Sequence, residues 1–286
     1  MTLSRLSVKT KLRAMYESSK TEFVHMLSYK IDTIMSVITI FLLIIWIVLA
    51  GISFADKGSQ YEQTFPSVVL YGTIVFLIVE SIMWGVGRFV RRQQMFGTME
   101  QIYMTPTDIR VIMIFSTFGR SVFLGFVIIA VTIIFGLLFP VSIGDVFLAI
   151  IVFIGAVLSS LGLALLFGAA TMGIKRANVI NNLVSFVLMF LMGAFFPFSF
   201  LPKQVIIIAA LLPVAYATDT LRAVMIPGWK PELVSVWPIH SFWGLSPLIT
   251  EIIFMYLYSL IVVFLGTWTV KKAEIQLLSK SGLGEY

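Results

Sequence analysis

Three charged side chains lie well inside otherwise apolar runs of this sequence: Glu80, Arg120 and Glu251. A charge in a hydrocarbon layer is costly, so each of them needs an opposite charge, water or a proton. The rise of an α-helix places Glu80 and Arg120 at similar depths if their runs form adjacent antiparallel helices. We therefore expect a structural Glu80–Arg120 pair, with a substrate or proton role as the alternative. Glu251 lies near the end of its run, where we expect it to reach water.

Other chemical signatures are missing. The sequence has no cysteine, which excludes disulfides and thiolate sites, and its two histidines, His25 and His240, lie far apart. The stretch GAATMGIK at 168–175 resembles a phosphate loop only superficially, because its lysine does not follow the second glycine directly and no Ser or Thr comes after it. We therefore expect no catalytic residue, no metal and no cofactor bound by this chain.

The apolar runs themselves set the fold class. Hydrophobic residues make up 59% of the chain, charged residues 12%, and the mean hydropathy is +1.01. Six runs approach or exceed the roughly 20 residues that cross a bilayer, at 31–54, 67–87, 111–139, 146–172, 179–196 and 248–270. They lack the apolar–polar alternation of barrel strands. The sequence predicts an all-α integral membrane protein with six transmembrane helices.

The distribution of positive charge gives the orientation. With six spans, fifteen lysines and arginines fall on the face that carries both termini and four on the other face, while Arg120 lies within a run. The positive-inside rule then places both termini in the cytoplasm, with the chain in the plasma or inner membrane of the cell. The charge is spread along a membrane face rather than gathered in a patch, so nucleic acid is not an expected partner.

Residues 1–30 form a first unit before the transmembrane domain of residues 31–286. Apolar residues recur there at helical spacing between lysines and arginines, which favours a cytoplasmic amphipathic helix lying in the membrane interface. A flexible basic leader is the alternative. About 30 mostly polar residues precede the first run, so we expect no cleavable signal peptide. Residues 271–286 are expected to be a cytoplasmic tail.

The cytoplasmic connection 93–110 contains a short amphipathic pattern. Met95, Phe96, Met99, Ile102 and Tyr103 share one face of a helix. A proline at position 106 ends the pattern, because proline cannot continue the hydrogen-bond ladder. Such a face suits either lipid headgroups or a partner protein.

The outer segment 197–247 is unusual, because it holds seven of the ten prolines and three of the six tryptophans. Its apolar pieces 205–212 and 215–226 are split by Pro213, and each is too short to span. We expect a re-entrant helical pair between spans five and six with an interfacial aromatic cap; an ordinary outer loop is the alternative. Small-residue pairs such as Gly155/Ser159 and Ala164/Gly168 predict close helix packing.

Two stretches resemble the permease subunits of type-2 ABC exporters. GTMEQIYMTP at 97–106 is similar to that family's cytoplasmic pattern E-x-G-T-L-E-x-L-x-x-T-P, although Met95 stands where the upstream acidic residue often is. FPFSFLP at 196–202, followed by Pro213, Tyr216 and Leu221-Arg222, is similar to the outer pattern FP-x-S-x-LP…P-x-x-Y…LR. The order, spacing and expected side of both stretches agree with the family.

The resemblance implies a half-sized transmembrane subunit that pairs with a second permease copy, in a homodimer or a related heterodimer, and with separate ABC ATPase subunits that bind ATP and Mg²⁺. It implies a coupling helix that docks on the ATPase, built from Gly97, Thr98, Met99, Glu100, Ile102, Tyr103, Thr105 and Pro106. It also implies an outer gate that includes Phe196, Pro197, Leu201, Pro202, Pro213, Tyr216 and Arg222.

The expected function is therefore ATP-driven export of an amphipathic or hydrophobic substrate, such as a drug, lipid or glycan, by a chain that is not itself an enzyme. An ATP-independent secondary transporter or channel, with Glu80 as a proton-linked carboxylate, is the main alternative. A non-transporting scaffold subunit is a further one.

Overall fold

The computed structural model describes residues 16–17, 19–20, 23–24, 28, 30–54, 64–97, 108–115, 117, 125–127, 130, 133–134, 143–172, 177–236 and 244–280. Within these ranges all regular elements are helical. The α-helices are α2 (Lys30–Phe54), α3 (Phe65–Met95), α6 (Val146–Met172), α7 (Ala177–Leu191), α8 (Lys203–Ala209), α9 (Pro213–Met225) and α11 (Pro247–Lys280). Two 3-10 turns, η2 (Phe198–Phe200) and η3 (Leu233–Val236), complete them. The all-α prediction is confirmed.

Three of the expected spans are helices that are long and apolar enough to cross a bilayer: Phe65–Arg91, Val146–Met172 and Pro247–Gln276. A fourth is possible if α8 and α9, which meet at 102°, form one broken span. Shorter apolar helical stretches lie at Thr33–Trp46 and Asn182–Leu191. The expected third span falls mostly outside the described residues. Six crossings therefore stay a prediction.

Two helix boundaries differ from the expected ones. α7 ends at Leu191, five residues before the predicted end, because Gly193 adopts a positive φ of 63°. The N–H groups of Gly193 and Ala194 bond back to Phe190 O (3.0 Å) and Met189 O (3.1 Å), which is the Schellman arrangement that terminates a helix. α11 instead continues for ten residues past position 270, because no glycine or proline interrupts the chain before position 281.

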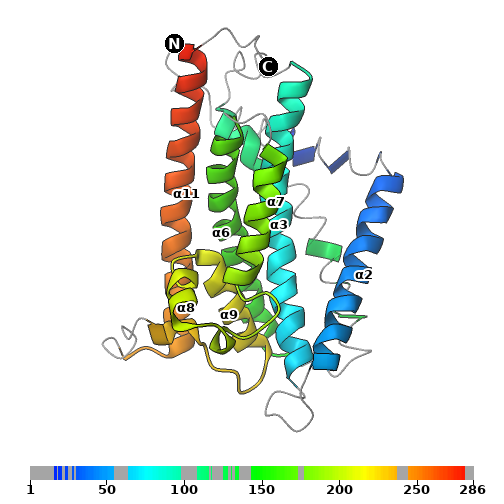
Figure 1. Ribbon diagram of the computed structural model, residues 1–286, viewed down its shortest axis with the longest axis vertical. Coiled ribbons are helices and arrows are strands. Elements are labelled where there is room, and N and C mark those ends of the chain that lie inside the picture. Colours follow the sequence, from blue (N-terminus) through cyan, green and yellow to red (C-terminus); the bar gives the residue numbers. More distant parts are fainter. Residues whose placement is uncertain are drawn as a thin grey trace.

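The axes of the long helices are roughly aligned, but the helices do not all run in the same direction. α3, α6 and α11 run toward one end of the molecule, and α2 and α7 run the other way (Figure 1). We call the end where α3 and α11 finish the basic end, because Arg88, Arg91, Lys271 and Lys272 lie within about three turns of it. We call the opposite end, where η2, α8, α9 and η3 gather, the cap end (Figure 1).

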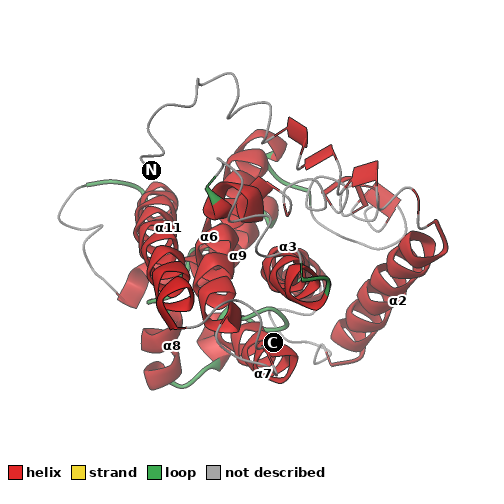
Figure 2. Ribbon diagram, turned by 90° about the horizontal axis from the view of Figure 1, so that it is seen from above, coloured by secondary structure: helices red, strands yellow, loops and turns green. Residues whose placement is uncertain are grey.

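The core is built around α6, which packs against α11, α3 and α9, and α9 also packs against α3 and α11. α6 and α11 approach closely along a seam of small residues. A Cβ added to Gly162 would lie 2.8 Å from the main-chain N of Val263, and the hydroxyls of Ser159 and Ser259 are 2.6 Å apart. α2 packs on α3 at the edge of the bundle (Figure 2). It exposes an apolar face that includes Ile34, Ile38 and Trp46.

Candidate functional site

At the basic end the structure places the two borders of the predicted coupling helix. α3 ends at Met95, and the exposed Gly97 takes a positive φ of 64°, with no contact within 4 Å from the described part of the chain at the position that a Cβ would occupy. A side chain there would be strained by the backbone alone. The predicted coupling residues 98–106 lie outside the described residues, so the prediction for them is not tested.

The chain returns at Asp108, which begins the next helical stretch. Its carboxylate accepts hydrogen bonds from the main-chain N of Arg110 (2.9 Å) and from Nε of the same residue (2.8 Å), and it forms an ion pair with the guanidinium. Partial burial would raise the pKa of Asp108, but the hydrogen bonds and charge of Arg110 and the charge of Lys271 outweigh it, and the pKa is lowered.

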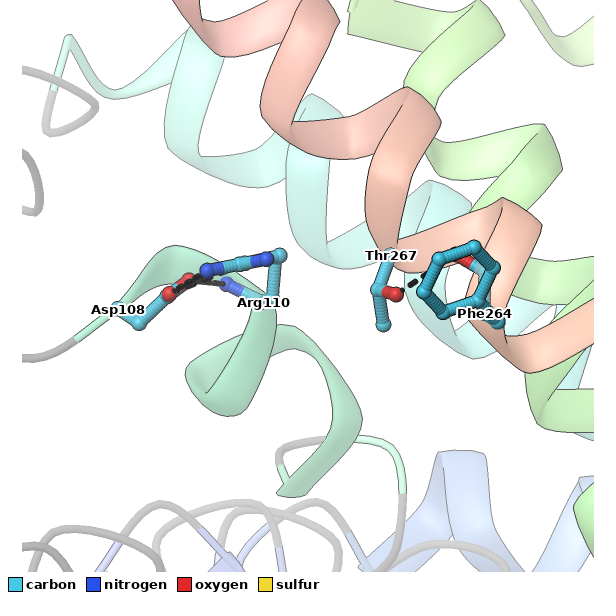
Figure 3. A network of polar contacts seen from close by, with 4 residues as sticks. All are labelled: Asp108, Arg110, Phe264 and Thr267. Carbon is cyan, nitrogen blue, oxygen red and sulfur yellow. Dashed lines mark hydrogen bonds and ion pairs between the residues drawn. The ribbon is translucent and has the colours of Figure 1, made fainter. Parts of the chain in front are cut away.

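This ion pair lies beside α11. Figure 3 shows Asp108 and Arg110 with Thr267 and Phe264 of α11 opposite them. The charges of Lys271 and Glu274, both on α11, act on Asp108 and Arg110. The segment that follows the predicted coupling helix is therefore held next to the end of the last span.

At the cap end, Arg222 is the centre of a buried set of hydrogen bonds. Its side chain is completely buried, and its guanidinium donates to four main-chain carbonyls. The acceptors are Val68 O on α3 (3.0 Å) and, after the end of α7, Gly193 O (2.5 Å), Ala194 O (3.4 Å) and Phe196 O (3.1 Å). The last three carbonyls belong to the chain that follows α7, and a cation beside the carboxyl end of a helix complements the helix dipole. Arg222 thus ties α9 to α3 and α7.

The other predicted gate residues surround the same place. Pro213 is the first residue of α9, and the ring of Tyr216 stacks on Phe254 and Tyr258 of α11, with centroids 6.1 and 5.9 Å away. Phe196 supplies one carbonyl to Arg222. Pro197 and Leu201 flank η2, and Pro202 directly precedes α8.

A family model described as ABC-2 type transporter matches residues 21–226, which run from before α2 to the end of α9. The chain belongs to the ABC-2 type transporter family. It is therefore a type-2 ABC transporter permease, a membrane-embedded subunit that associates with an ABC ATPase. No curated protein matches the chain.

The permease has two buried carboxyl groups that sequence reasoning did not place in the site. Asp219 was missed, although an acidic residue between apolar residues 215–226 is the same signal that singled out Glu80. Glu251 was expected to reach water, and this is wrong: both side chains are completely buried. Glu251 accepts hydrogen bonds from the N–H of Val234 (3.0 Å) and the hydroxyl of Thr220 (3.3 Å), which fill the positions that water would take.

The intramembrane charge pair stays a prediction. Arg120 lies outside the described residues. Glu80 is partly buried on α3, and the charge of Arg88, two turns further along the same helix, acts on it.

Proposed function

We propose that this permease is the six-span subunit of an ATP-driven exporter that moves an amphipathic or hydrophobic substrate, such as a drug, lipid or glycan, out of the cell. Two permease copies, identical or related, would assemble with two ABC ATPase subunits, and ATP and Mg²⁺ would bind to those subunits. The family match over residues 21–226 is the observation that carries the proposal.

The orientation we propose has the basic end in the cytoplasm of the cell, with both chain termini on that side. Arg88, Arg91, Lys271 and Lys272 lie there, whereas Lys203 and Lys230 are the exposed cations of the described cap end. An excess of lysine and arginine marks the cytoplasmic side of membrane proteins. The cap end would then face outward.

The coupling role proposed for residues 97–106 is supported by the positions of the residues on either side of this segment. Gly97 lies two residues after the end of α3, and Asp108 and Arg110 interact with charges near the end of α11. A force applied to the segment between them would therefore act on two spans. Glu100, together with the apolar face of Met99, Ile102 and Tyr103, would contact the ATPase.

The gating role proposed for the cap end is supported by its internal bonding. The bent pair α8–α9 is joined to α3 and the end of α7 through Arg222, so these elements would move together when the outer end opens. ATP binding would favour one of two states of the bundle only if the ATPase binds that state more tightly. We propose that the cap end is closed in the state that precedes release of the substrate to the outside.

Co-purification with the ATPase tests the coupling role. The triple variant Met99→Ala, Ile102→Ala, Tyr103→Ala should insert in the membrane at normal levels but lose the ATPase. The matched control, Trp268→Ala with Ile275→Ala, removes exposed apolar side chains from α11 near the same end and should retain it. Full ATPase recovery with the triple variant contradicts the assignment. Transport by the permease alone, driven by a pH gradient and indifferent to ATP, would instead support a secondary transporter.

A further inference from the structure

Two carboxyl groups from different helices hold the start of η3 at the cap end. Oδ2 of Asp219, on α9, accepts hydrogen bonds from the N–H groups of Glu232 (2.6 Å) and Leu233 (2.7 Å). Oε1 of Glu251, on α11, accepts one from the N–H of Val234 (3.0 Å). Three consecutive amides of one outer segment therefore depend on two side chains that are themselves completely buried.

The bonds to three consecutive amides bring the two carboxyl groups close together, and each acts on the other electrostatically. Ionised carboxylates only accept hydrogen bonds, so a direct bond between them requires a proton on one of them. With both groups ionised, Oδ1 of Asp219 has no donor within the part of the chain that the structure describes. A proton held between the carboxyls supplies the donor that this pair lacks.

The described groups around Asp219 and Glu251 do not neutralise the negative charge of the two carboxyls in place of that proton. Among the described residues that face the pair, Arg222 of α9 donates its hydrogen bonds to main-chain carbonyls and to neither carboxyl group. Glu232, from the held segment, adds a further negative charge near Asp219. Thr220 contributes a neutral hydroxyl. Two like charges in contact at a buried site are strongly disfavoured, and protonation of one group removes the conflict.

We propose that Asp219 and Glu251 form a proton-binding site that fastens the outer segment 232–236 to α9 and α11. One proton shared by the two carboxyls lets both accept the amides of η3. When the proton leaves, the two negative charges repel each other, the amides are released and the pair reaches water. A divalent cation suits the pair less well, because three of its four oxygens already accept hydrogen bonds. The site goes beyond the proposed function, since it requires neither ATP nor a direction of transport.

Hydrogen–deuterium exchange of the amides of residues 232–234, measured on the full-length permease in lipid nanodiscs, tests the site. Rates are corrected for the intrinsic effect of pH and measured in a series of acid to alkaline buffers. The fastened segment binds one more proton than the released segment, so protection should fall as pH rises. Within the transition the fall should be about tenfold per pH unit, the slope for a single proton.

Glu251→Gln imitates the protonated group, because its amide donates permanently toward Asp219. In this variant, protection should persist into alkaline buffer without the wild-type transition, and Asp219→Asn provides the same test if the first variant does not fold. The matched control is Glu274→Gln, which changes a carboxyl near the other end of α11, beside Asp108 and Arg110, and should keep the transition. A wild-type protein whose amides show no pH-dependent transition would overturn the proposal, as would Glu251→Gln retaining the wild-type transition.

Discussion

The guanidinium of Arg222 lies directly over Gly72 of α3. A Cβ added to Gly72 would be 2.5 Å from Nη2 of Arg222 and 2.1 Å from the carbonyl oxygen of Ala194. Both distances are too short for real contacts, and the carbonyl belongs to the backbone that follows α7. The absence of a side chain at position 72 is therefore a condition for the cap-end hydrogen bonds of Arg222.

Gly72→Ala should lower the stability of the permease, since overpacking of a well-packed core typically costs about 1–3 kcal/mol. Gly125→Ala is the matched control, because its Cβ would meet Phe153 at an ordinary 3.5 Å. Thermal unfolding in detergent should show a lower midpoint for the first variant and an unchanged or higher midpoint for the second. Equal midpoints for the two variants would count against the packing described here.

Arg222→Lys should also destabilise the permease, although the charge is kept. A lysine ammonium lacks the fork of donors that reaches carbonyls on two sides, and each buried carbonyl left unbonded costs about 1–3 kcal/mol. The thermal midpoint in detergent should therefore fall, whereas the exposed cation change Lys203→Met at the same end should have little effect. An Arg222→Lys variant as stable as the wild type would show that the four hydrogen bonds are not needed.

Gly162→Ala tests the seam between α6 and α11. The added methyl would lie 2.8 Å from the main-chain N of Val263 and 2.9 Å from the carbonyl carbon of Val262, so the two helices would have to separate. We expect a loss of about 1–3 kcal/mol. Ser160→Ala is a suitable control in the same thermal assay, because the Ser160 hydroxyl bonds to its own helix at Ala156 O. If Gly162→Ala is as stable as the wild type, α6 and α11 pack less closely than in this structure.

The Asp108–Arg110 ion pair predicts a dependence on pH at the basic end. The pKa of Asp108 is lowered from its ordinary value of 3.8, so its stabilising contribution is present above that value and is lost as the pH falls through the lowered pKa. Asp108→Asn should abolish this loss of stability at acidic pH. At neutral pH the variant should be less stable by up to about 1 kcal/mol, which is the range measured for partly exposed ion pairs. Hydrogen exchange of amides 109–115 across acidic buffers measures both effects. If the protection of these amides falls at acidic pH in Asp108→Asn as it does in the wild type, a group other than Asp108 causes the loss.

Much of the helical pattern could be predicted from apolar runs and their breaks. The expected fourth run coincides with α6 at both ends, because an uninterrupted apolar stretch follows Asp145, whose side chain caps the helix through the N–H groups of Phe147 and Leu148. The break at Pro213 likewise separates α8 from α9. Each of these signals is local in the sequence.

The hydrogen bonds of the cap end could not be predicted in the same way. Arg222 meets carbonyls that become available only because Gly193 ends α7 early, and it does so where Gly72 leaves room on α3. Asp219 and Glu251 come together across two helices. These partners are distant in the sequence, and periodicity within one helix carries no information about them.

The orientation of the coupling segment is the claim on which the transport proposal depends most. The chain has no cysteine, so single cysteines can be introduced and labelled in intact cells and in inside-out vesicles with a reagent that does not cross membranes. Thr98→Cys should react only from the cytoplasmic side, and Ser199→Cys, at the exposed surface of the cap end, only from outside. A cysteine at position 98 that reacts only from outside the cell would contradict the account.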